Sequence, residues 1–182
     1  MNNIATFVTF SRFIFAIIVA LLLCFESNII LIIAIILFIL GALSDAVDGT
    51  LARKQKNNSK FGAFIDPIAD KFLVFLVLIS LIYNTDSLAI FSLSIVIISR
   101  EILIMSLREW MASNNYQKPA EVSSMGKIKT FLQMSGICLV AASPLTSIQY
   151  FYEFSISVLT LGAIVGLISG YDYLKKSYKY LF

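Results

Sequence analysis

The segment DAVDGTLARKQKNNSKFGAFIDPIAD, from Asp45 to Asp70, places four of the chain's six aspartates between two long apolar runs. Asp45 and Asp48 are three residues apart, and Asp66 and Asp70 are four residues apart. On a helix, either spacing puts both carboxylates of a pair on one face. Two consecutive helices that each carry such a face predict a cluster of four carboxylates, which we call the aspartate cluster.

The aspartate cluster needs positive charge nearby. Like charges that lie a few ångströms apart raise one another's pKa and become partly neutral unless a cation holds them ionised. Oxygen ligands select hard cations, so the cluster predicts Mg²⁺ or Mn²⁺, and we expect two ions that share carboxylates. Sites in which carboxylates hold such cations typically bind phosphate groups. The chain has no histidine, which excludes His-ligated zinc and His-based nucleophilic catalysis.

The composition of the whole chain indicates a membrane protein. Of its 182 residues, 59% are hydrophobic and 14% charged, and the mean hydropathy is +0.88. Six apolar runs are each long enough to cross a hydrocarbon core about 30 Å thick. They cover approximately residues 7–25, 28–53, 62–83, 87–112, 125–142 and 152–174. We therefore predict an all-α, polytopic membrane protein with six transmembrane helices. Residues 1–182 would form a single integral membrane catalytic domain, with a short interfacial segment at about residues 1–12.

The distribution of basic residues predicts the orientation in the membrane. Lysine and arginine occur near the N-terminus, in the second–third and fourth–fifth connections, and near the C-terminus, but the other three connections have none. The positive-inside rule then places both termini, and the active site, on the cytoplasmic side. We expect a bacterial inner membrane, because no Arg-rich amphipathic presequence precedes the first run. The net charge of +3 is modest and gives no support for binding nucleic acid.

The spacing D-x2-D-G-x2-A-R-x8-G-x3-D-x3-D resembles the signature of the CDP-alcohol phosphatidyltransferase family at every fixed position. The matching residues are Asp45, Asp48, Gly49, Ala52, Arg53, Gly62, Asp66 and Asp70. The resemblance implies a six-span enzyme that moves a phosphatidyl or related group from a CDP-linked donor to an alcohol and releases CMP. It also implies a homodimer among membrane lipids.

The same resemblance implies a role for each motif residue. The metal ligands would be the four aspartates, Asp45, Asp48, Asp66 and Asp70. The CDP group would be surrounded by Asp45, Asp48, Gly49, Ala52, Arg53 and Gly62. Asp70 would also be the general base for the attacking hydroxyl. We expect direct attack rather than a covalent enzyme intermediate, since no Ser, Cys or His is evidently placed as a nucleophile.

A second polar group bears on the choice of alcohol. It consists of four cations, Arg100, Arg108, Lys127 and Lys129. The two arginines are eight residues apart, about 80° around a helix, so they border one face. A phosphorylated acceptor would need these cations in addition to Arg53, whereas free inositol, serine or choline would not. The alternative for the arginines is an ion pair with Glu101 or Glu109 together with anchoring at the membrane surface.

The stretches around these cations narrow the resemblance to the family branch that uses glycerol 3-phosphate. They are Arg100 to Trp110, Gly126 to Met134, and an N-terminal stretch from Asn3 to Arg12 in which Ala5 stands where that branch has proline. The implied reaction converts CDP-diacylglycerol and glycerol 3-phosphate into phosphatidylglycerophosphate and CMP. One alternative is the same chemistry with another acceptor, such as inositol phosphate or phosphatidylglycerol. A second is a cation transporter, which would need a polar path across spans whose outer halves are almost wholly apolar apart from Ser80.

Overall fold

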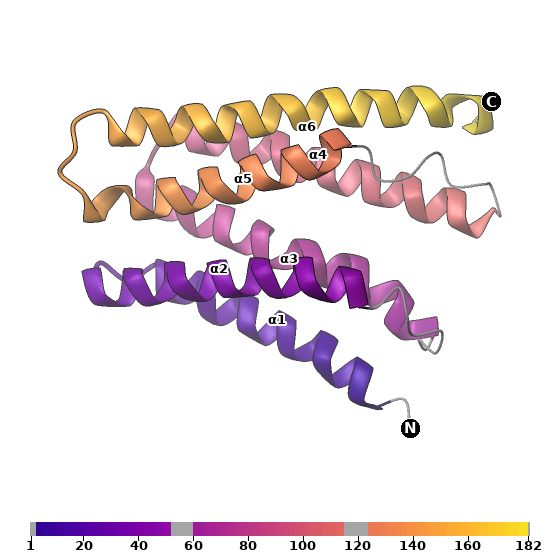
Figure 1. Cartoon of the computed structure of the whole chain (residues 1–182), viewed down its shortest axis with the longest axis horizontal. Coiled ribbons are helices and arrows are strands. Elements are labelled where there is room, and N and C mark those ends of the chain that lie inside the picture. Colours follow the sequence, from indigo (N-terminus) through magenta and orange to yellow (C-terminus); the bar gives the residue numbers. More distant parts are fainter. Residues whose placement is uncertain (1–2, 52–59, 115–123, 182) are drawn as a thin grey trace. The chain divides into compact units, whose positions relative to one another are not determined.

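The computed structural model describes residues 3–51, 60–114 and 124–181, and their side chains at 11–43, 68–69, 71–114 and 125–178. Over this part of the chain the regular structure is entirely helical, which confirms the predicted all-α class. Within the described residues, six α-helices follow one another in sequence (Figure 1). They are α1 (Asn3–Leu23), α2 (Asn28–Leu51), α3 (Lys60–Thr85), α4 (Leu88–Ser113), α5 (Ser124–Ala142) and α6 (Phe151–Leu181). A short 3₁₀ turn, Ser143–Leu145, follows α5.

Three stretches with described side chains are long and apolar enough to cross a membrane: Leu88–Ser113, Met125–Leu145 and Phe151–Tyr178. In α1, α2 and α3 the described apolar stretches are shorter, namely Ser11–Leu23, Asn28–Leu43 and Lys71–Thr85. Large apolar side chains are widely exposed, as is typical of a surface that faces lipid. The chain is thus an integral membrane protein, while six spans and cytoplasmic termini remain predictions.

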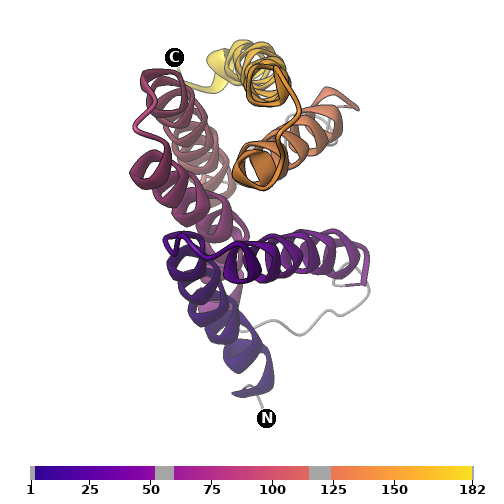
Figure 2. The same cartoon turned by 90° about the vertical axis from the view of Figure 1, so that its left-hand side faces the viewer.

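The chain divides into two compact units. Unit 1 comprises Met1–Asp86 and Val140–Ile148, and unit 2 comprises Ser87–Leu139 and Gln149–Phe182. In unit 1, α1 packs against both α2 and α3. In unit 2, α4 packs against α6. Figure 2 shows α1 and α2 diverging from the short connection that joins them.

Interhelical hydrogen bonds fix α1 against α3 within unit 1. The Ser80 hydroxyl donates to the carbonyl oxygen of Ala20 at 2.9 Å, and the Asn84 amide donates to the carbonyl oxygen of Leu23. The rings of Phe13 and Phe72 add an aromatic contact with centroids 4.8 Å apart. Hydrogen bonds between membrane helices contribute about 0.6 to 2 kcal/mol each. Ser80 therefore has a structural partner at the place where a transporter would need a polar path.

Candidate functional site

The backbone places each aspartate pair on a helix, as the sequence predicts. Asp45 and Asp48 lie in the last two turns of α2, and Asp66 and Asp70 lie in the first three turns of α3. One helical turn therefore separates the two members of each pair. Gly49 and Gly62 also lie on helical backbone, whereas Ala52 and Arg53 fall outside the described residues. The side chains of all eight motif residues lie outside the described part of the structure.

This arrangement fits a divalent metal. The C-terminal end of α2 and the N-terminal end of α3 lie toward the same end of unit 1 (Figure 1). Each helix end carries two carboxylates, and an all-oxygen donor set is the one that hard divalent cations prefer. Among the residues with described side chains, which do not include these aspartates, no group of three Asp, Glu, Cys or His could hold a metal ion.

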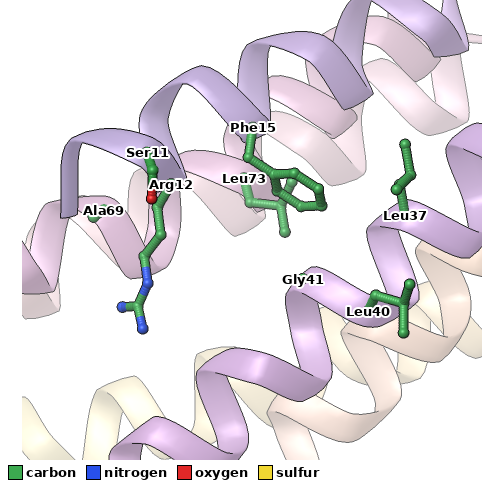
Figure 3. Close-up of a pocket in the computed structure, with 8 residues that line it drawn as sticks. All are labelled: Ser11, Arg12, Phe15, Leu37, Leu40, Gly41, Ala69 and Leu73. Carbon is green, nitrogen blue, oxygen red and sulfur yellow. The ribbon is translucent and has the colours of Figure 1, made fainter. Parts of the chain in front are cut away.

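A pocket of about 360 Å³ lies between α1, α2 and α3 within unit 1 (Figure 3). Its walls are formed by Ser11, Arg12, Phe15, Leu37, Leu40, Gly41, Ala69 and Leu73. The pocket adjoins the motif in the sequence, because Ala69 directly precedes Asp70 and Gly41 lies four residues before Asp45. Most of the walls are apolar, and Figure 3 shows the Arg12 side chain extending from α1 into the space beside α2. The pocket is thus a mostly apolar cavity, which suits an apolar part of a ligand.

Gly41 determines how closely the three helices approach at this pocket. A Cβ atom added there would lie 2.7 Å from Cε1 of Phe15 and 2.9 Å from Cδ2 of Leu73. Both distances are shorter than a normal carbon–carbon contact, so any larger residue must displace one of these side chains. Gly41 therefore keeps the α2 wall of the pocket open.

In unit 2, the structure joins two of the predicted acceptor cations through a single carboxylate. The Oε1 atom of Glu101 accepts a hydrogen bond from Nη1 of Arg100 at 2.7 Å and another from Nζ of Lys129. The three side chains are only 11%, 7% and 6% exposed for Arg100, Glu101 and Lys129, respectively. The ion pair considered from the sequence for Arg100 is present, and its partner is Glu101. We call these three residues the Glu101 cluster.

Helix α6 forms one side of the Glu101 cluster. Arg100 donates from Nε to the carbonyl oxygen of Gly166 at 3.0 Å and from Nη2 to Oγ of Ser169 at 3.1 Å. A Cβ atom at Gly170 would lie 3.2 Å from Nε of Arg100, and one at Gly166 would lie 3.3 Å from Cγ of Lys129. These glycines therefore let long polar side chains from α4 and α5 lie against the α6 backbone.

Sequence reasoning missed this part of α6. The available signal was the regular spacing of Gly162, Gly166 and Gly170, four residues apart, which marks one face of a helix. The third of these close approaches involves Gln133, whose Nε2 donates to the carbonyl oxygen of Gly162 at 3.3 Å. Small residues on one helix face are typical of close helix packing in membranes.

The other two predicted acceptor cations are exposed. The Arg108 guanidinium lies over the ring of Tyr173 in α6, with Cζ 5.1 Å from the ring centroid. A cation–π contact of this kind holds a guanidinium in place while leaving its charge available. Lys127 lies near the start of α5 and is exposed, although Lys129, two residues later, is buried. The four cations thus form a buried pair and an exposed pair within unit 2.

Comparison with known proteins places the chain in a family. Residues 2–168 match the model of the CDP-alcohol phosphatidyltransferase family, whose members generally use divalent metal ions. A protein of Rickettsia bellii is 35% identical over 180 residues, which cover 98% of this chain and 97% of that protein. A protein of Yersinia pestis (strain Pestoides F) is 35% identical over 143 residues, 79% of this chain and 77% of that protein.

A third relative, from Wigglesworthia glossinidia brevipalpis, is 48% identical over 102 residues, which cover 56% of each chain. All three relatives are named CDP-diacylglycerol–glycerol-3-phosphate 3-phosphatidyltransferase. The family match spans almost the whole chain and includes every residue of the aspartate motif, which confirms the resemblance found in the sequence. This chain belongs to the CDP-alcohol phosphatidyltransferase family.

Proposed function

We propose that this chain is an enzyme that transfers the phosphatidyl group of CDP-diacylglycerol to glycerol 3-phosphate, giving phosphatidylglycerophosphate and CMP. The observation that carries the proposal is the similarity, over 98% of the chain, to a Rickettsia bellii protein named for this reaction. We place the enzyme in the bacterial inner membrane as a homodimer, with its active site on the cytoplasmic side.

The aspartate cluster is the proposed metal site. Asp45, Asp48, Asp66 and Asp70 would hold two divalent cations, Mg²⁺ or Mn²⁺. When bound, these ions neutralise the diphosphate of the donor and stabilise negative charge on the departing CMP. Arg53 adds a positive charge beside the same diphosphate. The small residues Gly49, Ala52 and Gly62 leave room for the CDP group to approach the backbone.

The chemistry is a direct displacement at phosphorus. The hydroxyl oxygen of glycerol 3-phosphate forms a bond to the phosphorus of the phosphatidyl group, and the bond from that phosphorus to the CMP oxygen breaks. Asp70 takes the hydroxyl proton as the oxygen attacks. Because a carboxylate is a weak base for an alcohol, correct positioning of the hydroxyl must supply part of the rate enhancement.

We assign the pocket between α1, α2 and α3 to the lipid part of the donor. Its apolar walls suit the glycerol and acyl groups of a diacyl lipid. The position of the pocket next to Asp70 in the sequence supports this assignment, since the lipid and the diphosphate are parts of one molecule.

Replacing Gly41 with valine should raise the KM for CDP-diacylglycerol about tenfold. The added side chain would crowd the residues that form the pocket walls, and overpacking of this kind costs about 1 to 3 kcal/mol. The KM for glycerol 3-phosphate should change far less. The measurement is steady-state kinetics in mixed micelles with each substrate varied in turn. Ala42→Val is the matched control, because Ala42 is the next residue of α2 and is not part of the pocket wall. If both variants raised the KM for CDP-diacylglycerol equally, the pocket would not be part of the donor-binding site.

Replacing Arg108 with alanine should raise the KM for glycerol 3-phosphate about ten- to a hundredfold, since a charge-assisted hydrogen bond contributes ~1.5–3 kcal/mol. Lysine at this position should also be impaired, because it lacks the planar fork that binds phosphate through two nitrogens. Lys175→Ala, a change to an exposed cation near the end of α6, should leave both KM values unchanged. If Arg108→Ala changed the KM values for donor and acceptor equally, Arg108 would be an anchor at the membrane surface and not an acceptor-binding residue.

The choice of acceptor is tested by offering several alcohols to the purified protein. CMP release from CDP-diacylglycerol should be fast with glycerol 3-phosphate and slow with inositol phosphate or phosphatidylglycerol. If CMP release were faster with inositol phosphate or phosphatidylglycerol than with glycerol 3-phosphate, the protein would still be a phosphatidyltransferase, but the assigned acceptor would be wrong.

A further inference from the structure

Arg100 and Arg108 both lie on α4, but they are held in different ways. Arg100 is nearly buried and donates hydrogen bonds to three residues of α4 and α6. Arg108 is exposed, and it forms neither an ion pair nor a hydrogen bond with another residue of the described part of the chain. It lies instead over the ring of Tyr173 in α6, with Cζ 5.1 Å from the ring centroid. The partner that the fold provides for Arg108 is therefore an aromatic ring and not a carboxylate.

We propose that Tyr173 is a positioning residue that holds Arg108 in place to bind the phosphate of glycerol 3-phosphate. This inference rests on the proposed function, in which Arg108 binds the acceptor. A cation within about 6 Å of a ring centroid is attracted to the face of the ring, and Arg108 lies within that range. The ring adds no negative charge, so the full charge of the guanidinium remains for an anion. A carboxylate in the same place would neutralise that charge and compete with the phosphate.

The contact with Tyr173 also leaves the hydrogen-bond donors of Arg108 for a ligand. A guanidinium has five N–H groups, and two of them can bind one phosphate side by side. None of the hydrogen bonds between described residues uses an N–H group of Arg108. Because Arg108 is exposed, an anion can reach these donors without first breaking an ion pair.

The fold holds the Tyr173 ring independently of Arg108. Tyr173 is half-buried on α6, and α6 packs against α4 within unit 2. An arginine side chain is long and loses conformational freedom when it binds a ligand, and a contact that fixes it beforehand reduces this cost. Loss of the ring should therefore weaken binding of the acceptor and leave binding of the donor unchanged.

The test is Tyr173→Leu in the full-length protein, with CDP-diacylglycerol and glycerol 3-phosphate varied in turn. Leucine is apolar but has no ring, so the acceptor KM should rise about two- to fivefold, while kcat and the donor KM should change by less than about 1.5-fold. Tyr173→Met should have the same effect and takes the place of Tyr173→Leu if that variant fails to fold. Methionine fills irregular spaces but also lacks a ring.

Two further variants show whether the ring itself matters. Tyr173→Phe keeps the ring, and the Tyr173 hydroxyl forms no hydrogen bond with another described residue, so this conservative variant should retain the low acceptor KM. Tyr171→Leu is the matched control. Tyr171 is exposed two residues earlier on α6, and no cation of the described part of the chain lies over its ring, so both KM values should stay unchanged.

Combining Tyr173→Leu with Arg108→Ala tests whether Tyr173 acts through Arg108. Once the guanidinium is absent, removal of the ring should cause no further rise in the acceptor KM. A rise of the same size with and without Arg108 would mean that Tyr173 affects the acceptor by another route, and the inference would be wrong.

The outcomes separate this inference from the proposed function. If the unsubstituted protein does not use glycerol 3-phosphate, the proposed function is wrong and this inference is wrong with it. If the protein does use it, but Tyr173→Leu, or Tyr173→Met in its place, changes neither KM or both equally, the proposed function stands and Tyr173 is a packing residue. A rise in Tyr173→Phe equal to that in Tyr173→Leu would assign the effect to the hydroxyl and contradict the role of the ring.

Discussion

Replacing any one of Asp45, Asp48, Asp66 or Asp70 with asparagine should lower turnover by orders of magnitude, and chelation of divalent metal should abolish it. The reason is that each amide removes a charged ligand from a site where four carboxylates on two helix ends need a cation. The measurement is CMP release at increasing Mg²⁺ or Mn²⁺ concentration. For Asp66→Asn, higher metal concentration should restore part of the activity.

Two aspartates outside the motif serve as matched controls. Asp86 has a φ of 43°, a backbone conformation that asparagine adopts as readily as aspartate, so Asp86→Asn should not strain the chain. Asp172 is exposed on α6, and Asp172→Asn should also retain full activity. Full activity of Asp66→Asn in the presence of chelator would contradict the assigned metal site.

Asp70→Asn should lower kcat by at least about a hundredfold while the protein still binds CDP-diacylglycerol, because an amide cannot take the proton of the attacking hydroxyl. A single-turnover rate and an equilibrium titration with donor separate the two effects. Added metal should rescue Asp66→Asn more than Asp70→Asn, since only Asp70 has a second role as base. Normal turnover of Asp70→Asn at saturating substrate would mean that another group is the base.

Hydrophobicity predicted the positions of the helices well. The run expected at about 87–112 is α4, Leu88–Ser113, because polar residues end both the apolar run and the helix. The last helix is longer than its apolar run of about 152–174 and continues to Leu181. Hydropathy marks the part of a helix suited to lipid, whereas the backbone stays helical through polar residues such as Lys175 and Lys176.

The Glu101 cluster could not be derived from the sequence. The sequence shows four cations and two acids near one end of α4 and α5, but which cation meets which acid depends on helix packing. Lys127 and Lys129 illustrate this point, because residues two apart lie about 200° around a helix from each other. One is therefore exposed and the other buried, and only the structure identifies Lys129 as the buried one.

The aspartate motif shows the opposite case. The spacing of the motif alone predicts the two helical pairs of aspartates. All its fixed positions lie within one segment of chain, and residues three or four apart on a helix lie on the same face. The backbone of α2 and α3 agrees with that prediction. What the spacing could not give is the pocket beside Gly41, which requires a third helix, α1, to be positioned against the other two.

The most direct test of the central claim is an assay of the purified protein in detergent with CDP-diacylglycerol and glycerol 3-phosphate, with and without Mg²⁺ or Mn²⁺. The products should be phosphatidylglycerophosphate and CMP in equal amounts, and they should form only when divalent metal and both substrates are present. Product formation that is unaffected by chelator, or CMP release without phosphatidylglycerophosphate, would contradict the proposed metal-dependent phosphatidyl transfer.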